Sequence, residues 1–189
     1  MSATPHQSSP EPAVDETRAV VNPGRWVLDA GRSSVVFASK TLWGLAVVHG
    51  EFTRFSGVGT ISKDGTAQGR LEIDSASVNT NNKTRDGHLR SADFFNAQTY
   101  PQIVVDVLSA RLANGNQVHL SAQLTVAGVR KPRQCIAMMV DASADEVTLQ
   151  VEVEIDKREF GMTSNRLNML KDPSRVSVFA KFTRTNTPK

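Results

Sequence analysis

The sequence contains a single cysteine, Cys135, among its 189 residues, which excludes a disulfide framework within the chain. It also lacks any run of about 18 apolar residues, so we expect no transmembrane helix and no stable membrane insertion. Like charges form no block of five or more, and the formal net charge is only +3. Such weak, dispersed charge argues against nucleic-acid binding. What remains is a globular protein, long enough for one domain with a substantial core.

The N-terminal segment, residues 1–24, differs in composition from the rest of the chain. Four of the eight prolines lie there, with serines and acidic residues between them. Such a segment has too little apolar surface to offset the entropy cost of ordering, so we predict a disordered tail followed by one domain over residues 25–185. Residues 1–23 lack the apolar core of a secretory signal, and we therefore expect a cytoplasmic protein.

From Trp26 onward, apolar and polar residues alternate with the period of two that is typical of half-buried strands. The clearest example is Val147, Leu149, Val151, Val153 and Ile155, and residues 71–73, 120–126 and 176–182 repeat the pattern. Lys-Asp-Gly at 63–65 and Asn-Gly-Asn at 114–116 carry the turn residues of tight hairpins. The pattern predicts an all-β antiparallel fold, either a sandwich or a barrel, and closure into a barrel would remove the exposed edges.

One polar stretch, residues 81–95, interrupts this β pattern. Asn81 and Asn82 are good N-caps and predict a short helix inserted between two strands. Gly87 lowers the intrinsic stability of that helix, so tertiary contacts must hold it in place.

The same stretch resembles the central motif of the YceI-like family, through Arg-Asp-Gly-His-Leu-Arg-Ser-Ala-Asp-Phe-Phe at 85–95 and Tyr-Pro at 100–101. Further segments match the family's pattern in order, at residues 26–29, 33–37, 50–52, 55–57, 76–80, 124–132 and 158–162. This resemblance, over about residues 26–182, implies a lipocalin-like antiparallel β-barrel of about eight strands with a long apolar cavity. It also implies a ligand such as a polyisoprenoid, an isoprenoid quinone or another long-chain amphiphile.

The alternation alone leaves the interior undecided, because an eight-stranded barrel can be filled by its own side chains or can hold one ligand. The resemblance favours a cavity. From alternation and from position in the family pattern, the candidate wall residues are Phe37, Val48, Phe52, Leu71, Ile73, Leu89, Phe94, Phe95, Leu124, Ile136, Met138, Val151, Val153, Met162, Val178 and Phe182.

Five polar residues of the central motif form a second candidate site: Arg85, Asp86, His88, Arg90 and Asp93. The favoured interpretation is a polar helix that caps the barrel and ties its loops through Arg–Asp hydrogen bonds. The alternatives are contact with a ligand head group, or acid–base catalysis by Asp86 and His88. Catalysis is disfavoured because these two side chains, two residues apart, would point to different sides of a helix. The chain also lacks a Gly-x-Ser-x-Gly nucleophile motif.

We therefore expect a protein that sequesters, stores or carries a long-chain isoprenoid or related lipid and is not an enzyme. No cofactor other than the bound lipid is expected, and no metal, because the four histidines lack the close spacing of a zinc motif. Two alternatives stay open: a self-filled barrel acting as a stress-response or interaction domain, and a small hydrolase or isomerase. A homodimer also stays open.

Overall fold

The computed structural model describes residues 21–41, 46–162 and 173–185. Within these ranges most residues lie in β-strands. The strands are β1 (Gly24–Leu28), β2 (Ser34–Thr41), β3 (Ala46–Phe52), β4 (Phe55–Ile61), β5 (Ala67–Asp74), β6 (Val78–Asn79), β7 (Gln102–Leu112), β8 (Gln117–Val126), β9 (Val129–Ala142), β10 (Glu146–Ile155) and β11 (Ser174–Thr185). The helical elements are α1 (Lys83–Arg90) and the short 3-10 helices η1 (Ala30–Arg32), η3 (Ser75–Ser77) and η4 (Lys157–Phe160).

Most of the predicted tail, residues 1–20, lies outside the described residues. The part that is described, residues 21–24, is attached to the barrel. The backbone N–H of Asn22 donates to the carbonyl of Ala144 at 3.1 Å. The carbonyl of Asn22 accepts a hydrogen bond of 3.3 Å from Trp26 Nε1, and β1 begins at Gly24.

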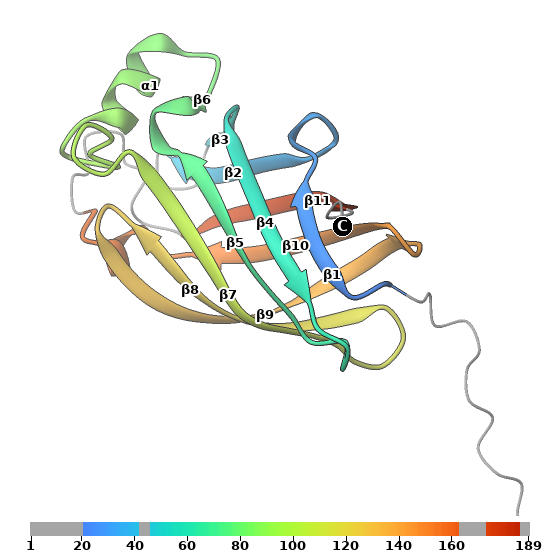
Figure 1. The fold of residues 1–189 in the computed structure, drawn as a ribbon. Helices are drawn as coiled ribbons and strands as arrows, with labels where there is room; N and C mark the ends of the chain where they lie inside the picture. The colour runs from blue at the N-terminus through green and yellow to red at the C-terminus, as the bar shows by residue number, and fades with distance from the viewer. Residues whose placement is uncertain (1–20, 42–45, 163–172, 186–189) are drawn as a thin grey trace, which may run out of the picture.

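Eight antiparallel strands close into a barrel (Figure 1). Their order around the ring is β1, β4, β5, β7, β8, β9, β10 and β11, and the pairing of β11 with β1 completes it. This confirms the predicted all-β barrel of about eight strands. Because each ring strand has a neighbour on both sides, its backbone groups find partners that an open sheet would leave exposed at its edges. Strands β2, β3 and β6 continue the sheet from β11 beyond the ring.

The last strand, β11, pairs with two successive strands along one side. Its first half pairs with β2, and its last four residues pair with β1. The helix η1 separates β1 from β2. The carboxylate of Asp29 starts this helix by accepting hydrogen bonds from the backbone N–H groups of Gly31 at 3.0 Å and Arg32 at 3.2 Å. β1 and β2 therefore act as one interrupted strand, and β2 leads the sheet out of the ring.

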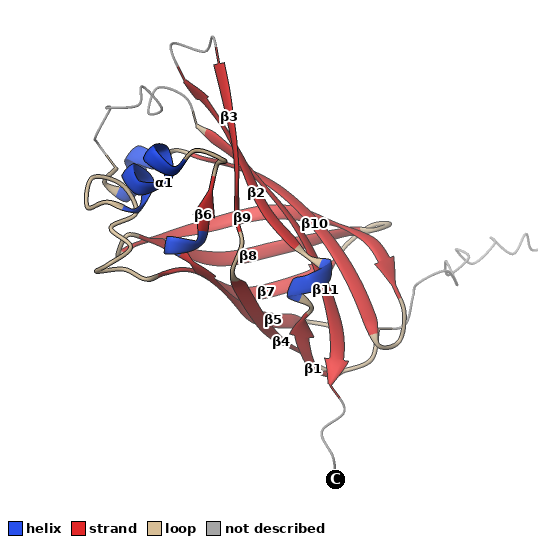
Figure 2. Ribbon diagram, turned by 90° about the horizontal axis from the view of Figure 1, so that it is seen from above, coloured by secondary structure: helices blue, strands red, loops and turns tan. Residues whose placement is uncertain are grey.

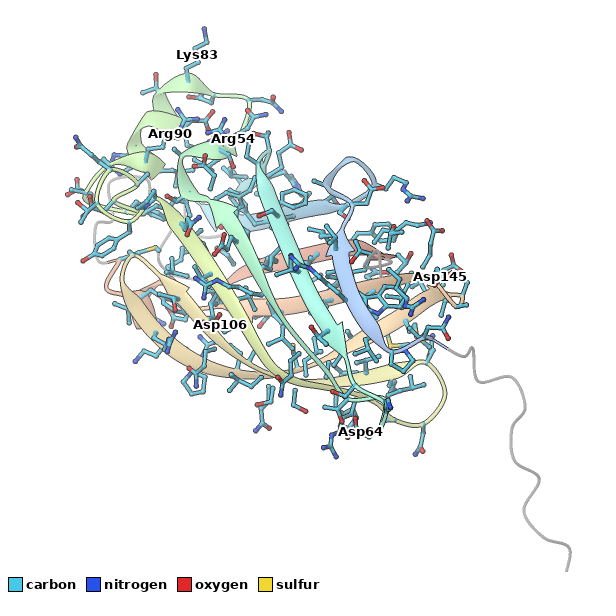
Figure 3. All side chains as sticks on the ribbon, in the orientation of Figure 1. Arg54, Asp64, Lys83, Arg90, Asp106 and Asp145 are labelled. Carbon is cyan, nitrogen blue, oxygen red and sulfur yellow. The ribbon has the colours of Figure 1, made fainter. Side chains whose placement is uncertain are left out.

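The inserted helix, α1, lies at one end of the barrel (Figure 2). It begins after Asn82, whose side-chain oxygen accepts a hydrogen bond of 3.0 Å from the backbone N–H of Arg85. This confirms the predicted helix, although the helix is shorter than residues 81–95 and continues as turns. In Figure 3, Lys83 marks the α1 end of the barrel, and Asp64, in the β4–β5 hairpin, marks the opposite end.

Beneath α1, a cluster of large side chains packs together at this end of the barrel. Its buried members are Val35, Phe52, Ile73, Val78, Leu89, Phe94, Ile103, Val126, Phe160 and Met162. A second cluster has a smaller buried centre, formed by Ala110, Val118 and Ala137. The two ends of the barrel interior are therefore packed with side chains of very different size.

Candidate functional site

The barrel encloses a cavity of about 1010 Å³. Its wall reaches from Leu89 and Phe94 at the α1 end to residues 63–66 in the β4–β5 hairpin at the other end. Such a volume stands at the top of the range of about 300 to 1,000 Å³ that small-molecule sites occupy. The interior is thus not filled by the protein's own side chains, and the cavity predicted from the resemblance is present.

Small residues at inward-facing positions explain why this space stays open. Ala67, Ala110, Ala122 and Ala180 all line the cavity. The interior of an eight-stranded barrel is just wide enough for side chains to fill it. Four methyl groups in place of leucine or valine side chains therefore leave a substantial volume unoccupied.

Most of the predicted wall residues lie where they were expected. Inward-facing residues such as Leu124 and Val151 are only half-buried, since each borders the cavity on one side. The predicted residues that line the cavity are Phe37, Phe52, Leu71, Ile73, Leu89, Phe94, Phe95, Leu124, Val151, Val153, Met162, Val178 and Phe182.

Three predicted wall residues do not line the cavity: Val48, Ile136 and Met138. The side chains of Ile136 and Met138 are 50% and 37% exposed. Their neighbours Cys135 and Met139 line the cavity instead. The prediction chose the wrong face of β9, because a shift of one residue moves every side chain of a strand to the other face.

Val48 fails for another reason. It pairs with Ser39 of β2, which does line the cavity. The two side chains share a face of the sheet, because directly opposed residues in an antiparallel pair point the same way. Strand β3 lies beyond the closed ring, however, so Val48 is half-buried and does not reach the cavity.

In the polar motif, Asp86 is buried and joins α1 to Thr80, which precedes the helix in the chain. Its Oδ1 accepts hydrogen bonds from the backbone N–H of Thr80 at 2.9 Å and from the Thr80 hydroxyl at 2.6 Å. Arg85 also binds Thr80. Its Nε donates to the Thr80 hydroxyl at 2.7 Å, and its Nη2 donates to the Thr80 carbonyl at 2.8 Å. This arrangement fixes the start of the helix to the residue that directly follows β6.

Arg90 secures the other end of α1. Its Nε donates to the carbonyl of Ala76 at 2.8 Å, and its Nη2 donates to the carbonyl of Val78 at 2.7 Å. The motif therefore ties the loops, and the hydrogen bonds described for Arg85 and Arg90 run to Thr80 and to backbone carbonyls, not to Asp86. Asp93 is exposed. His88 is half-buried, and its Nε2 is buried without a hydrogen-bond partner among the described residues.

We expect Asp86→Ala to weaken the attachment of α1. Without the carboxylate, the buried N–H and hydroxyl of Thr80 lose their acceptor, which typically costs about 1 to 3 kcal/mol. Urea denaturation of the two proteins measures the difference. Lys83→Ala, an exposed change on the same helix, is the matched control and should alter the unfolding free energy by less than about 0.5 kcal/mol. Equal stability of Asp86→Ala and the wild type would contradict the structural role.

Two polar residues of β9 also lie on the cavity wall. Cys135 is half-buried, and burial raises the pKa of its thiol above the ordinary value, so it stays protonated at neutral pH. Arg133 also lines the cavity, and its guanidinium carbon lies 5.5 Å from the ring centre of Phe160. Over the described ranges, no three His, Cys, Asp or Glu side chains gather where they could hold a metal ion.

The wall also contains a buried polar group that the sequence did not predict. Lys157, Ser174 and Ser39 line the cavity near the α1 end, and all three are buried. Alternation gives no signal for them, since it identifies inward positions only where they are apolar.

In the described part of the chain, none of the helices has the length and hydropathy of a membrane span.

Comparisons with known proteins agree on the domain. The model of the YceI-like domain family matches residues 26–182. Protein YceI of Escherichia coli O157:H7 is 34% identical over 104 residues, 54% of each chain, and protein YceI of Salmonella arizonae is 28% identical over 129 residues, 65% of this chain and 67% of the relative. The chain thus spans about half the length of the first of these relatives.

Two solved structures share the fold. The crystal structure of BcnA from Burkholderia cenocepacia aligns with a TM-score of 0.73 at 19% identity, over 82% of this chain and 98% of that one. A polyisoprenoid binding domain from Saccharophagus degradans, implicated in plant cell wall breakdown, aligns with a TM-score of 0.69 at 24% identity, over 85% and 98%.

Proposed function

Because the chain belongs to the YceI-like domain family, whose model spans residues 26–182, we propose that its barrel binds one long-chain apolar lipid of the isoprenoid type. The cavity of about 1010 Å³ carries this proposal. The Saccharophagus degradans domain, a polyisoprenoid binding domain of the same fold, supports the choice of ligand class.

The chemistry of the wall suits such a ligand. Aliphatic and aromatic side chains line the cavity along most of its length, from Phe94 at the α1 end to Leu112 and Leu120 on β7 and β8. Each methylene-sized group transferred from water to such surroundings contributes about 0.8 kcal/mol, so one five-carbon unit contributes on the order of 4 kcal/mol. Ordering of the ligand offsets part of this gain. Affinity should therefore rise with chain length until the cavity is full.

Sequestration or transport fits this geometry better than the alternatives. A barrel that served only as an interaction domain would have no need of a large apolar interior. Acid–base chemistry by Asp86 and His88 is disfavoured. The Asp86 carboxylate is buried and accepts two hydrogen bonds from Thr80, so its role is to hold the helix in place. We therefore propose a binding protein without turnover.

Protein purified without detergent and analysed by native mass spectrometry should carry a non-covalent mass, and organic extraction should release a long-chain lipid. The variant Ala122→Trp tests whether that lipid lies in the cavity. Ala122 lines the cavity on β8, so an indole there occupies the space of the ligand. We expect the variant to fold and to lose the bound mass.

The matched control is His119→Trp, which places the same indole on the exposed face of the same strand. It should retain the lipid as the wild type does. Retention of the bound lipid by Ala122→Trp would mean that the ligand lies elsewhere. Conversion of the extracted lipid by the wild-type protein would overturn the proposal of binding without turnover.

A further inference from the structure

At the α1 end of the cavity, the wall changes from apolar to polar. On β11, the inward-facing residues Val176, Val178, Ala180 and Phe182 are apolar, but the row begins with Ser174. Ser174 is 6% exposed, and its hydroxyl is hydrogen-bonded to that of Ser39 on β2, which is 2% exposed. Two hydroxyl groups from neighbouring strands thus meet in the wall.

A lysine joins them from the short helix η4. Lys157 is 6% exposed, and its Nζ donates a hydrogen bond of 2.9 Å to the hydroxyl of Ser174. The helix that holds Lys157 is fixed at both ends. The carboxylate of Asp156 accepts a hydrogen bond of 2.9 Å from the backbone N–H of Arg158. Gly161 closes the helix with a left-handed φ of 77°, and its N–H donates to the carbonyl of Arg158 at 3.1 Å.

This polar group is expensive to maintain in an apolar wall. An ammonium group removed from water loses solvation that protein contacts must replace. Binding sites for small molecules typically combine a mostly apolar wall with a few convergent polar groups that fix the orientation of the ligand. Lys157, Ser174 and Ser39 fit that description, because all three line the same cavity from different elements.

We propose that Lys157, Ser174 and Ser39 form a subsite for an oxygen-bearing head group that accepts hydrogen bonds, such as a hydroxyl, a carbonyl or a carboxylate. This inference rests on the proposed function, since it places the head of the lipid at the α1 end and its tail along the barrel toward the β4–β5 hairpin. A serine hydroxyl can both donate and accept a hydrogen bond, and an ammonium group attracts an oxygen acceptor through its charge as well as its N–H groups. The subsite thus selects a lipid with a polar end over a plain hydrocarbon.

Three probes with one branched skeleton test this: phytane, phytanol and phytanic acid. Their affinities for the intact protein can be measured by competition with a fluorescent lipid. We expect phytanol and phytanic acid to bind more tightly than phytane. Lys157→Met keeps the length of the side chain but removes its charge. In this variant the ratio of the affinity for phytanol or phytanic acid to that for phytane should fall by about tenfold to a hundredfold, as for a lost hydrogen bond to a charged group. Affinity for phytane should stay within about twofold.

Lys83→Met, an exposed change at the same end of the barrel, is the control and should leave all three affinities unchanged. If Lys157→Met does not fold, Ser39→Ala removes one hydroxyl and should reduce the advantage of phytanol in the same direction. Equal binding of phytane and phytanol by the wild type, or an unchanged advantage in the variants, would overturn the subsite while the proposed function stands. Failure of all three probes to bind would overturn the proposed function itself.

Discussion

Val151→Asp should abolish lipid retention and lower the stability of the protein. Val151 lines the cavity near the middle of β10. An aspartate there must either remain ionised beside apolar groups, at a cost on the order of several kcal/mol, or stay protonated with a strongly raised pKa. Whether it is ionised or protonated, the carboxyl places a polar group where the lipid needs an apolar wall. Native mass spectrometry and urea denaturation measure the two effects.

Gln150→Asp is the control for this change. Gln150 is the preceding residue on the same strand and is exposed, so its carboxylate stays in water. It should retain the lipid and change the unfolding free energy by less than about 0.5 kcal/mol. Normal lipid content in Val151→Asp would show that Val151 does not line the binding site, whatever the effect on stability.

Phe94→Ala should cost about 3 to 5 kcal/mol of unfolding free energy, in the range of buried aromatic truncations. The Phe94 side chain is 5% exposed within the cluster beneath α1, and its ring packs edge-on against Phe95 with centroids 5.3 Å apart. Truncation leaves a void next to the existing cavity and loosens the α1 end. The lipid should consequently dissociate faster as well.

Thermal and urea unfolding of Phe94→Ala can be compared with those of Leu108→Ala. Leu108 is 50% exposed on β7, and its truncation removes apolar atoms without opening a void. We expect its unfolding free energy to change by less than about 0.5 kcal/mol. A loss as small as that in Phe94→Ala would mean that the α1 end collapses around the missing ring.

The sequence allowed the barrel and much of its wall to be predicted where one face of a strand is apolar and the other polar. In β10, residues from Val147 to Ile155 alternate strictly, and the apolar set lines the cavity. The glycines of both predicted hairpins, Gly65 and Gly115, adopt the positive φ that such turns need, at 80° and 64°. Local rules of this kind depend on few residues, so they survive without knowledge of the fold.

The prediction was wrong where the sequence pattern does not indicate which side chains of a strand point into the barrel. In β9, residues 135–140 are apolar on both sides, so a period of two does not distinguish Cys135 and Met139, which line the cavity, from Ile136 and Met138. Lys157 could not be found for the opposite reason. A lysine is expected in water, and only the tertiary placement of η4 directs its side chain to Ser174.

The sharing of β11 between β1 and β2 also bears on the order in which the barrel forms. Its hydrogen bonds to β1 join residues about 160 positions apart, as in the bond from the Thr185 hydroxyl to the carbonyl of Arg25. Contacts so distant in sequence have the highest loop-closure entropy and are slow to form. On the ribosome, where N-terminal segments emerge first, β1 must wait for the last strand. Until that pairing forms, β1 has a neighbour on one side only, and the ring of strands stays open between β1 and β11.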